Sequence, residues 1–459
     1  MKPELFHFHV SPTVVPAGQV SQITIFGHGD YYRFYDDVTY TITVCPKEIH
    51  DTAIDDDFTL SEYSYHRIVT TAKNGIITLE YPFIEEQEWE LVVCAGPEQK
   101  QHLHSIYHAY QQYWDLEEME RGITFHIYSL QQDLYHKRAF RGDLHTHSNA
   151  SDGKENPEIV CANLRRLGYD FCSLTDHHYF PSSLRAKKRM EELKTCFTVF
   201  PGEEVHNKYA GRFHVVNFNG TSSVNQMILE NQELVKTEVK EKSAKMQEIQ
   251  GKEAEEVAWY QWITQAIRKS GGLSIFAHPF WTVKHCYNSP TNITKEVLKR
   301  GYFDIFELLG GCTPAENNLQ NALYQDMRAE GLRIPIVGST DVHSTVQFGL
   351  SHCATAHTLV FAASPEEIPS AVMDCYSVAV ETLPQENKRV YGPFRLVKYA
   401  QFLLDYYYPL LDPLYQASGT MILEYFKGDL ACKSIIEAIE HKIKQSELDF
   451  FGKRQRKIT

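Results

Sequence analysis

The stretch RGDLHTHSNASDG, residues 141–153, places two histidines, two aspartates and a turn glycine in one short segment. Side chains alternate between the two faces of a strand, so His145 and His147 would point to the same side. The Ser, Asn and Gly residues that follow are typical of a loop and place both histidines at the end of a strand. The stretch therefore predicts two imidazoles that face one point.

Other strand-like runs later in the chain also end in residues that bind metals. The runs are RGDLHTHS, YDFCSLTDHH, CFTVFPGEEVH, RFHVVNFNG, GLSIFAHPF, FDIFELLGG and IPIVGSTDVHS. Because the carboxyl ends of the strands of a parallel barrel meet on one face, these side chains should gather in space. The candidate metal ligands are His145, His147, Asp152, His177, Glu204, His214, His278, Asp341 and His343. Imidazoles and carboxylates without thiolates suit Zn, Mn or Fe in a site with several ions.

Each candidate alone has a simpler interpretation, because a single histidine at a strand end is more often a hydrogen-bonded structural residue. The H-x-H, T-D-H and D-x-H motifs on successive strands favour a metal site instead. Asp143 and Asp176 are predicted to accept hydrogen bonds that orient the imidazoles, although both also suit turns.

The composition indicates a globular protein of two or three domains. The chain has 459 residues, of which 43% are hydrophobic and 23% charged, with 45 Lys and Arg against 59 Asp and Glu. The resulting net charge of −14 disfavours binding of long nucleic acid. Neither a secretory signal nor an apolar run long enough for a membrane span is evident, so we expect a cytoplasmic protein. The ten cysteines are scattered along the chain, so we expect them to be reduced.

Three regions follow from the change of pattern along the chain. Residues 1–135 alternate β-type runs with turns and predict a β-sandwich-like domain that serves as a scaffold or as a wall that gates the substrate. Residues 136–363 alternate strands and helices, and include a charged helical insertion at about 227–270 that we expect to be solvated. Residues 364–459 predict a helical region packed on the second domain. Asn156, Pro157 and Gly168 mark the start and the end of one helix.

The motifs DLHTHSNASDG, LTDHH, PGEEV, HVVNF, AHPF and STDVHS, in this order, resemble those of the PHP (polymerase and histidinol phosphatase) superfamily. The resemblance spans residues 141 to about 350. The β-domain and the segment GPFRLVKYAQFLL resemble the carbaryl-hydrolase-like branch of that superfamily. The resemblance implies a distorted seven-stranded α/β barrel with a trinuclear metal site that hydrolyses phosphoesters.

The same resemblance implies an assignment of ligands to three metal positions. His145, His147, Glu204 and Asp341 would hold one ion, Glu204, His214 and His278 a second, and Asp152, His177 and His343 a third.

This sequence departs from the family pattern at two places. Where relatives often have E-x-x-N, the run ELLGG keeps Glu307 but has glycine at the asparagine position. The residue after His177, often Asn in relatives, is His178. In PGEEV the spacing favours Glu204 over Glu203 as the ligand.

Two or three divalent ions would clamp phosphate oxygens and lower the pKa of a bound water from roughly 15.7 to about 7. The predicted catalytic residues are Glu204 and Asp341, together with His206 and His178 as candidate proton donors to the leaving group. A metal-bound water is an alternative donor. Arg185, Lys187 and Arg212 could meet a phosphate, although loop cations are more often simply solvated.

The leading hypothesis is a metal-dependent phosphoesterase with two to three divalent ions (Zn, Mn or Fe), acting on a small phosphorylated metabolite, nucleotide or short oligonucleotide. One alternative is a hydrolase of carboxylic esters, carbamates or amides that uses the same site. A second alternative is a metal-stabilised binding or regulatory module, which the intact ligand set disfavours. No membrane partner is expected, and the oligomeric state is not predicted. If the β-domain supplied further ligands, His7, His9 and His28 would be the first candidates.

Overall fold

The computed structural model describes residues 7–28, 32–48, 66–95, 122–206, 214–346, 355–383 and 385–452. Contacts within the chain divide it into two units. The first unit comprises Met1–Lys137, Phe402–Leu411 and Lys442–Thr459, and the second comprises Arg138–Gln401 and Asp412–His441. The C-terminal helical region, which we expected to pack on the second domain, has residues in both units.

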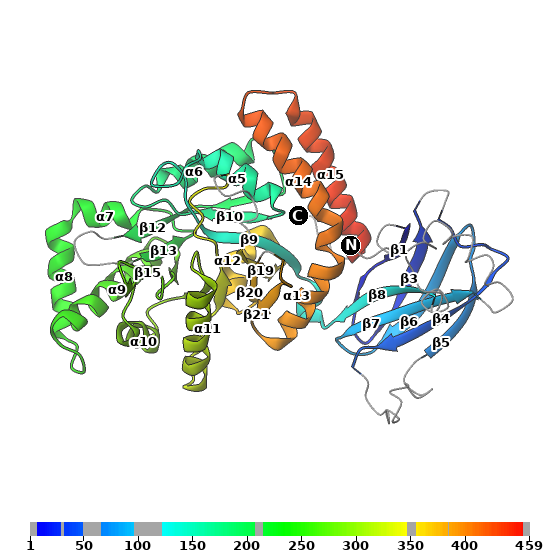
Figure 1. Ribbon diagram of the computed structural model, residues 1–459, viewed down its shortest axis with the longest axis horizontal. Helices are drawn as coiled ribbons and strands as arrows, with labels where there is room; N and C mark the ends of the chain where they lie inside the picture. The colour runs from blue at the N-terminus through cyan, green and yellow to red at the C-terminus, as the bar shows by residue number, and fades with distance from the viewer. Residues whose placement is uncertain are drawn as a thin grey trace. The chain divides into compact units, whose positions relative to one another are not determined.

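The first unit is built mainly from two sheets (Figure 1). One has the strand order β1-β3-β6 and the other the order β2-β8-β7-β4-β5. The strands are β1 (Phe8–Ser11), β2 (Val14–Pro16), β3 (Gln19–Gly27), β4 (Thr39–Pro46), β5 (His66–Thr71), β6 (Ile76–Phe83), β7 (Glu88–Ala95) and β8 (Ile123–Leu130). Exposed and buried residues alternate along β6, as expected for a sheet with one solvated face. Ile25 and Leu79 of one sheet and Ile42 and Leu91 of the other belong to one buried cluster, so the sheets share a core.

The second unit contains two larger sheets. A six-stranded sheet has the order β11-β10-β9-β19-β20-β21, and a five-stranded sheet has the order β12-β13-β14-β17-β18. The strands are β9 (Arg138–Thr146), β10 (Phe171–Leu174), β11 (Thr198–Phe200), β12 (Gly202–His206), β13 (His214–Phe218), β14 (Leu273–Phe276), β17 (Ile305–Leu309), β18 (Ile336–Gly338), β19 (Ala356–Ala362), β20 (Ser377–Glu381) and β21 (Arg389–Tyr391). Residues of both sheets, including Leu144, Phe171, Val216 and Ile275, form one buried cluster.

The structure does not confirm the expected seven-stranded barrel, because the strands of the second unit form two separate sheets. In the described part of the chain, only the isolated bridges Thr146↔Val342 and His177↔Glu204 join the two curled sheets. The reason lies in β9, whose residues 138–142 pair with β19 along one edge while β10 occupies the other. Little of β9 is therefore left to pair with β18. Only Thr146, the last residue of β9, forms a bridge, with Val342 in the segment that follows β18. A mixed α/β fold with a helical C-terminal region is confirmed.

Helices connect and cover these strands. They are α4 (Gln132–Tyr135), α5 (Pro157–Arg166), α6 (Pro181–Glu191), α7 (Val224–Glu230), α8 (Gln232–Ala244), α9 (Gly251–Lys269), α10 (Thr291–Lys299), α11 (Pro314–Ala329), α12 (Ile368–Met373), α13 (Phe394–Tyr406), α14 (Tyr408–Phe426) and α15 (Cys432–Phe451). A short hairpin of β15 (Thr282–Val283) and β16 (Cys286–Tyr287) and a 3-10 helix, η4 (Pro365–Glu367), complete the described elements. None of the described helices is both long and apolar enough to cross a membrane.

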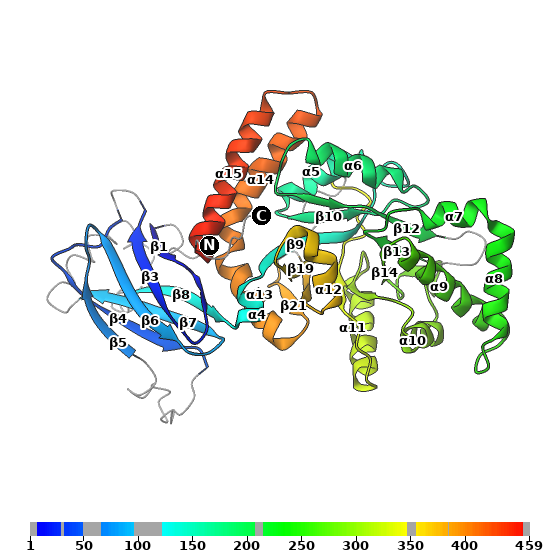
Figure 2. The same ribbon diagram turned by 180° about the vertical axis from the view of Figure 1, so that it is seen from behind.

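Two helical predictions are refined by the structure. As predicted, helix α5 begins at Pro157 and Gly168 follows its end, with a positive φ of 91°. The side chain of Asn156 does not cap the helix, however, and instead accepts a hydrogen bond from the Asn149 amide. The charged insertion is helical, yet α9 is not a solvated helix. It packs on β13 and β14 (Figure 2) and buries Val257, among other residues, in a core cluster.

Candidate metal centre

The predicted ligands come from strand ends and the loops that follow them. His145 lies near the end of β9, and His147, His177 and His278 follow strands β9, β10 and β14. Asp341 and His343 follow β18, Asp152 lies in the loop after β9, and Glu204 lies within β12. His214 differs from expectation because it begins β13 rather than ending it. Strand β13 is antiparallel to β12 and pairs His214 with His206, so its first residue reaches the same end of the sheet.

The structure brings these residues together in three groups of potential ligands. The groups are His147, Asp152, His177 and His343; His145, Glu204, His278 and Asp341; and His177, Glu204 and His214. The ligand atoms in each group lie within 4.8 Å of one another. The grouping differs from the assignment implied by the family resemblance in three residues: His147 joins Asp152, His278 joins His145, and His177 belongs also to the group of Glu204 and His214.

Glu204 is at the centre of this arrangement. Its carboxylate oxygens lie 2.6 Å from His214 Nδ1, 3.1 Å from His145 Nε2 and 3.3 Å from His147 Nε2. His177 Nδ1 is 3.3 Å away and His278 Nε2 is 3.5 Å away. A single carboxylate that reaches so many imidazoles is placed to bridge more than one ion.

Several buried atoms in the cluster have no hydrogen-bond partner among the described residues. They are Nε2 of His145, both ring nitrogens of His147 and of His278, Nδ1 of His177, Oε2 of Glu204 and Oδ1 of Asp341. Buried polar groups without a partner cost free energy and are rare in folded proteins. Divalent metal ions would satisfy these nitrogen and oxygen atoms, so the residues present fit a metal centre.

The electrostatics of the cluster support the same interpretation. Burial opposes the ionisation of Glu204, but the surrounding imidazoles, His214 first, hold its pKa well below the usual range. Burial likewise opposes the charge on His147, yet the carboxylates of Asp341 and Glu204, 2.9 and 3.3 Å from its Nε2, raise its pKa to about 9. Burial is the main cause that lowers the pKa of His177 to about 4; the imidazoles of His147 and His214 also lower it, and the nearby carboxylates oppose the change. The carboxylates are thus ionised and attract positive charge.

The group around Asp152 is the most open to solvent. The side chain of Asp152 is 54% exposed and that of His343 is 38% exposed, whereas that of His145 is fully buried. A hydrogen bond from His343 is the main cause that lowers the pKa of Asp152. A substrate would therefore approach from the side of Asp152 and His343.

Three residues of the cluster have backbone conformations that non-glycine residues seldom adopt. The φ angles of His178, His278 and Asp341 are 58°, 24° and 50°. Such conformations cost free energy and are concentrated at functional sites.

Glu307 has a role that the sequence reasoning missed. One of its oxygens lies 3.0 Å from His145 Nδ1, and the other accepts the backbone N–H of His278 at 3.2 Å. Because a carboxylate only accepts, Nδ1 of His145 carries the proton and Nε2 keeps its lone pair for a metal. The position of Glu307 at a strand end was a usable signal, but its partner is distant in sequence.

The glycine that replaces the family asparagine is required by packing. A Cβ atom at Gly310 would lie 2.5 Å from Oε1 of Glu307 and 3.1 Å from Cβ of His278. Asn317, on α11, occupies the nearby space and accepts the backbone N–H of Gly310 at 2.9 Å. The side chain of Asn317 therefore lies next to the position at which the resembled family often has asparagine.

Asp143 and Asp176, which lie next to the ligands, accept hydrogen bonds from backbone N–H groups rather than from imidazole rings. Asp143 accepts the backbone N–H groups of His145 and Thr340, and burial raises its pKa to about 7. Asp176 accepts from the backbone and hydroxyl of Ser148 at 2.7 Å each. Both residues hold the loops that carry the ligands.

Glu203 has a structural role. Its carboxylate accepts hydrogen bonds from the Ser223 hydroxyl, the Val224 backbone and the Asn225 amide at the start of α7. It points away from the cluster because neighbouring residues on a strand face opposite sides.

The candidate proton donors lie beside the cluster. The rings of His178 and His206 are stacked, with centroids 5.5 Å apart, and His206 is 4.6 Å from His214. Burial, followed by the charge of His214, lowers the pKa of His206 to about 4. Trp281 lies near the other side of the cluster, with its ring centroid 5.5 Å from that of His278.

Two of the three candidate phosphate contacts, Arg185 and Lys187, lie on α6. Arg185 makes two hydrogen bonds to Glu158, at 2.6 and 3.0 Å, so its guanidinium is already paired. Lys187 lies on α6 and is partly buried. Arg212 lies outside the described residues.

Among the residues that the structure describes, the histidines of the first unit are not part of these three groups. His7, His9 and His28 lie in or beside β1 and β3. A separate group, Glu88, Glu90 and His126, lies on β7 and β8, but Glu90 is paired with Lys47 and Glu88 is bonded to His126 at 2.8 Å.

Comparisons with known proteins give only distant similarities. No family model and no curated protein matches the chain. One solved structure is a two-domain protein from Bacteroides vulgatus ATCC 8482 that contains a predicted PHP-like metal-dependent phosphoesterase. It is 18% identical to this chain, with a TM-score of 0.38. The match covers 54% of this chain and 66% of the other, which is just under two thirds. A putative metal-dependent phosphoesterase from Bifidobacterium adolescentis ATCC 15703 is 16% identical with a TM-score of 0.33, covering 44% of this chain and 87% of the other.

A third solved structure is an amidohydrolase from Chromobacterium violaceum with bound sulfate and no metal. It is 15% identical with a TM-score of 0.31, and the match covers 45% of this chain and 88% of the other. Similarities at this level assign no activity.

Proposed function

We propose that this protein is a metal-dependent phosphoesterase that acts on a small phosphorylated metabolite, a nucleotide or a short oligonucleotide. The observation that carries the proposal is the cluster of imidazoles and carboxylates around Glu204, in which buried ring nitrogens have no partner among the described residues. Metal-dependent hydrolysis is the chemistry that such a set of nitrogen and oxygen ligands serves.

The three groups of ligands would hold two to three divalent ions, Zn, Mn or Fe. When bound, these ions supply Lewis acidity toward the phosphate oxygens and lower the pKa of water. The seven-stranded barrel and the trinuclear arrangement implied by the family resemblance remain part of the proposal.

The chain itself orients the ligands. Glu307 accepts a hydrogen bond from the Nδ1–H group of His145 at 3.0 Å, which leaves Nε2 of His145 facing Glu204. His343 Nδ1 donates to the backbone carbonyl of Asp341 at 2.7 Å, which leaves Nε2 facing Asp152 at 3.3 Å. Both imidazoles are therefore held in the tautomer that binds a metal through Nε2.

His178 and His206 are the proposed proton donors to the leaving oxygen, and the low pKa of His206, about 4, restricts donation by its imidazolium to acidic pH. Their stacked rings adjoin His177 and His214 without belonging to any of the three ligand groups. A side chain that lies beside the reacting phosphate and is not bound to a metal can deliver a proton there.

The preference for small substrates rests on charge. A chain with a net charge of −14 repels a polyanion at long range, whereas metal ions attract one phosphate locally. Neither long nucleic acid nor a membrane is proposed as a partner.

The test combines elemental analysis with a substrate screen on the full-length protein. We expect two to three transition-metal ions per chain, loss of activity on chelation, recovery with Mn, Zn or Fe, and turnover of phosphomonoesters or phosphodiesters. Turnover of carboxylic esters or amides alone would replace phosphoesterase by the alternative hydrolase. Bound metal without turnover of any class would favour a binding module, and metal-free protein that hydrolyses phosphoesters in EDTA would refute the metal site.

A further inference from the structure

We propose that Glu155 is a positioning residue that sets the affinity of the most exposed ion of the metal centre, the ion that Asp152 and His343 would share. Glu155 lies in the connection between β9 and α5 and belongs to none of the three ligand groups described above. By this role Glu155 sets the concentration of free metal at which the centre is complete. The inference rests on the proposed function, because it takes the metal centre as given and adds a residue that holds two of its ligands in place.

The carboxylate of Glu155 joins two segments that carry ligands. One oxygen accepts a hydrogen bond from the hydroxyl of Ser344 at 2.8 Å. The other oxygen accepts the backbone N–H of Thr345 at 2.9 Å and the hydroxyl of the same residue at 3.3 Å. We call these three hydrogen bonds the clasp. The clasp ties the connection that carries Asp152 to the segment after β18 that carries His343.

The main chain brings the same two segments together. The backbone N–H of Lys154 donates to the carbonyl of His343 at 2.8 Å. A Cβ atom at Gly153 would lie 2.8 Å from the carbonyl oxygen of His147, so only glycine lets the chain fold so closely over this ligand. The side chain of Glu155 is therefore the part of this contact that a substitution can remove without changing the main chain.

The ligands that the clasp joins are the ones that most need it. Asp152 and His343 are the most exposed ligands of the centre and lie in connections, whereas His145, Glu204 and His278 are buried in or next to strands. Oδ2 of Asp152 lies 3.3 Å from Nε2 of His343, so an ion held by both needs the two connections at a fixed distance. Loss of an outer residue that orients metal ligands costs about 10–100-fold in affinity.

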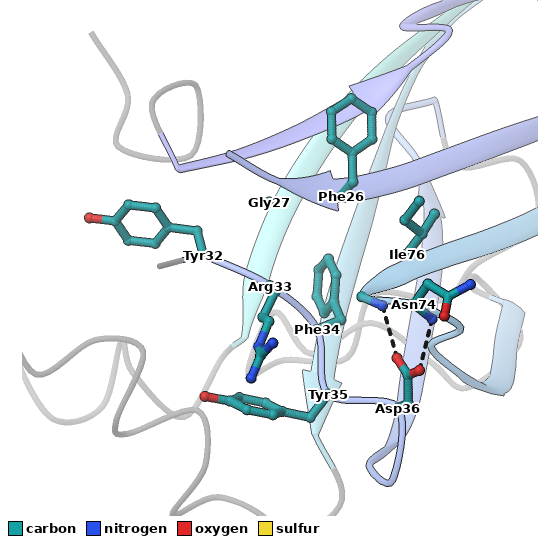
Figure 3. A pocket seen from close by; sticks show the side chains of 10 residues that line it. Phe26, Gly27, Tyr32, Arg33, Phe34, Tyr35, Asp36, Asn74 and Ile76 are labelled. Atoms are coloured by element: carbon teal, nitrogen blue, oxygen red, sulfur yellow. Dashed lines mark hydrogen bonds between the residues drawn. The ribbon is translucent and has the colours of Figure 1, made fainter. Parts of the chain in front are cut away.

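Another carboxylate makes the same kind of contact between segments that carry none of the nine ligands. Asp36 of the first unit accepts the backbone N–H groups of Asn74 and Gly75, each at 2.8 Å, as the dashed lines in Figure 3 show. These bonds tie the connection between β3 and β4 to the turn before β6. Asp36→Ala is therefore a matched control for Glu155→Ala, because it also unties two connections but leaves every ligand-bearing segment untouched.

The experiment is competition of the Zn²⁺-loaded, full-length protein with a chelating dye, together with elemental analysis. Asp152→Asn, which alters a ligand of the exposed group, identifies the ion in question because it should weaken the binding of one ion per chain. We expect Glu155→Ala to weaken the same ion by about tenfold or more and to leave the other ions unchanged. Asp36→Ala should leave the affinity of every ion unchanged.

Glu155→Gln separates the position of the carboxylate from its charge. The glutamine oxygen can accept the backbone N–H of Thr345 while its amide donates to the hydroxyl of Ser344, because a hydroxyl both donates and accepts. The clasp is thereby kept, and we expect Glu155→Gln to recover most of the zinc affinity. Ser344→Ala removes one bond of the clasp, so it should weaken the same ion by a smaller factor and have no further effect in the Glu155→Ala background. The thermal midpoint of each variant shows that it is folded.

The outcomes separate this inference from the proposed function. Wild-type protein that binds no metal would refute the metal centre itself. Wild-type protein that binds ions, with a folded Glu155→Ala variant that keeps all of them at wild-type affinity, would overturn only the role of Glu155. Equal weakening of every ion in Glu155→Ala, weakening of the same ion in Asp36→Ala, or a Glu155→Gln variant as weak as Glu155→Ala would also overturn that role.

Discussion

Replacing Glu204 with Gln, and separately its neighbour Glu203 with Gln, should damage two different properties of the protein. Glu204 lies within 3.5 Å of ring nitrogens of several candidate ligands, led by His214 at 2.6 Å. An amide is a weak metal ligand and cannot bridge two ions as a carboxylate does. We expect Glu204→Gln to lose metal and to reduce kcat/KM by more than the roughly 100-fold that loss of an outer-shell partner costs.

The fold of Glu204→Gln should survive, because the nearby core consists of apolar residues such as Leu144 and Ile275 that do not contact metal. Glu203→Gln should behave in the opposite way. Its side chain would keep one acceptor oxygen but turn an NH₂ toward one donor at the start of α7, such as the Asn225 amide at 3.0 Å. Loss of one hydrogen bond to a charged acceptor costs about 1.5–3 kcal/mol.

The assays are metal content by elemental analysis, kcat/KM on the best phosphoester found, and thermal unfolding. Glu203→Gln should unfold on the order of 5 °C earlier while keeping its metal and most of its activity. Near-normal turnover and metal content in Glu204→Gln would remove Glu204 from the metal centre. An inactive, metal-free Glu203→Gln with unchanged stability would show that the two roles are reversed.

Four further predictions follow from the same geometry. Glu307→Gln should lower metal affinity about 10–100-fold, measured by competition with a chelating dye, because the orienting acceptor of His145 Nδ1 loses its charge; unchanged affinity would contradict this. Gly310→Asn, which restores the family pattern, should lower stability or metal content because its Cβ would clash with Glu307, and a fully active variant would show that the loop can move. In chelator-treated protein, the pKa of His147 is about 9 in the folded chain and 6.5 in the unfolded chain. The stabilisation from protonated His147 is therefore complete below about pH 6.5 and is lost as the pH rises toward 9. Thermal midpoints that rise over this pH range would refute the pairing of His147 with Asp341 and Glu204. Finally, hydrolysis efficiency should fall from a mononucleotide to longer oligonucleotides and duplex DNA, and efficiency that increases with length and decreases steeply with salt would instead require a basic groove.

The sequence by itself determined the features that depend on local periodicity. Alternation along a strand predicts that His145 and His147 share a face, and the same rule separates Glu204 from Glu203. Proline at the start and glycine after the end delimited the helix Pro157–Arg166, because both residues act through their own backbone angles. The order of strand-end motifs indicated which residues would gather, and the structure brings all nine predicted ligands into three overlapping groups.

Only the tertiary structure decided the features that depend on contacts between distant segments. The bond between His145 and Glu307 joins residues 162 positions apart, and no local pattern specifies it. The same holds for Gly310, whose missing side chain makes room for Glu307 and His278. The barrel prediction is not confirmed, because each strand has two edges and β19, far along the chain, takes one edge of β9. Periodicity reports which face of an element is buried, whereas the partner of each edge and of each buried polar atom is set by the fold as a whole.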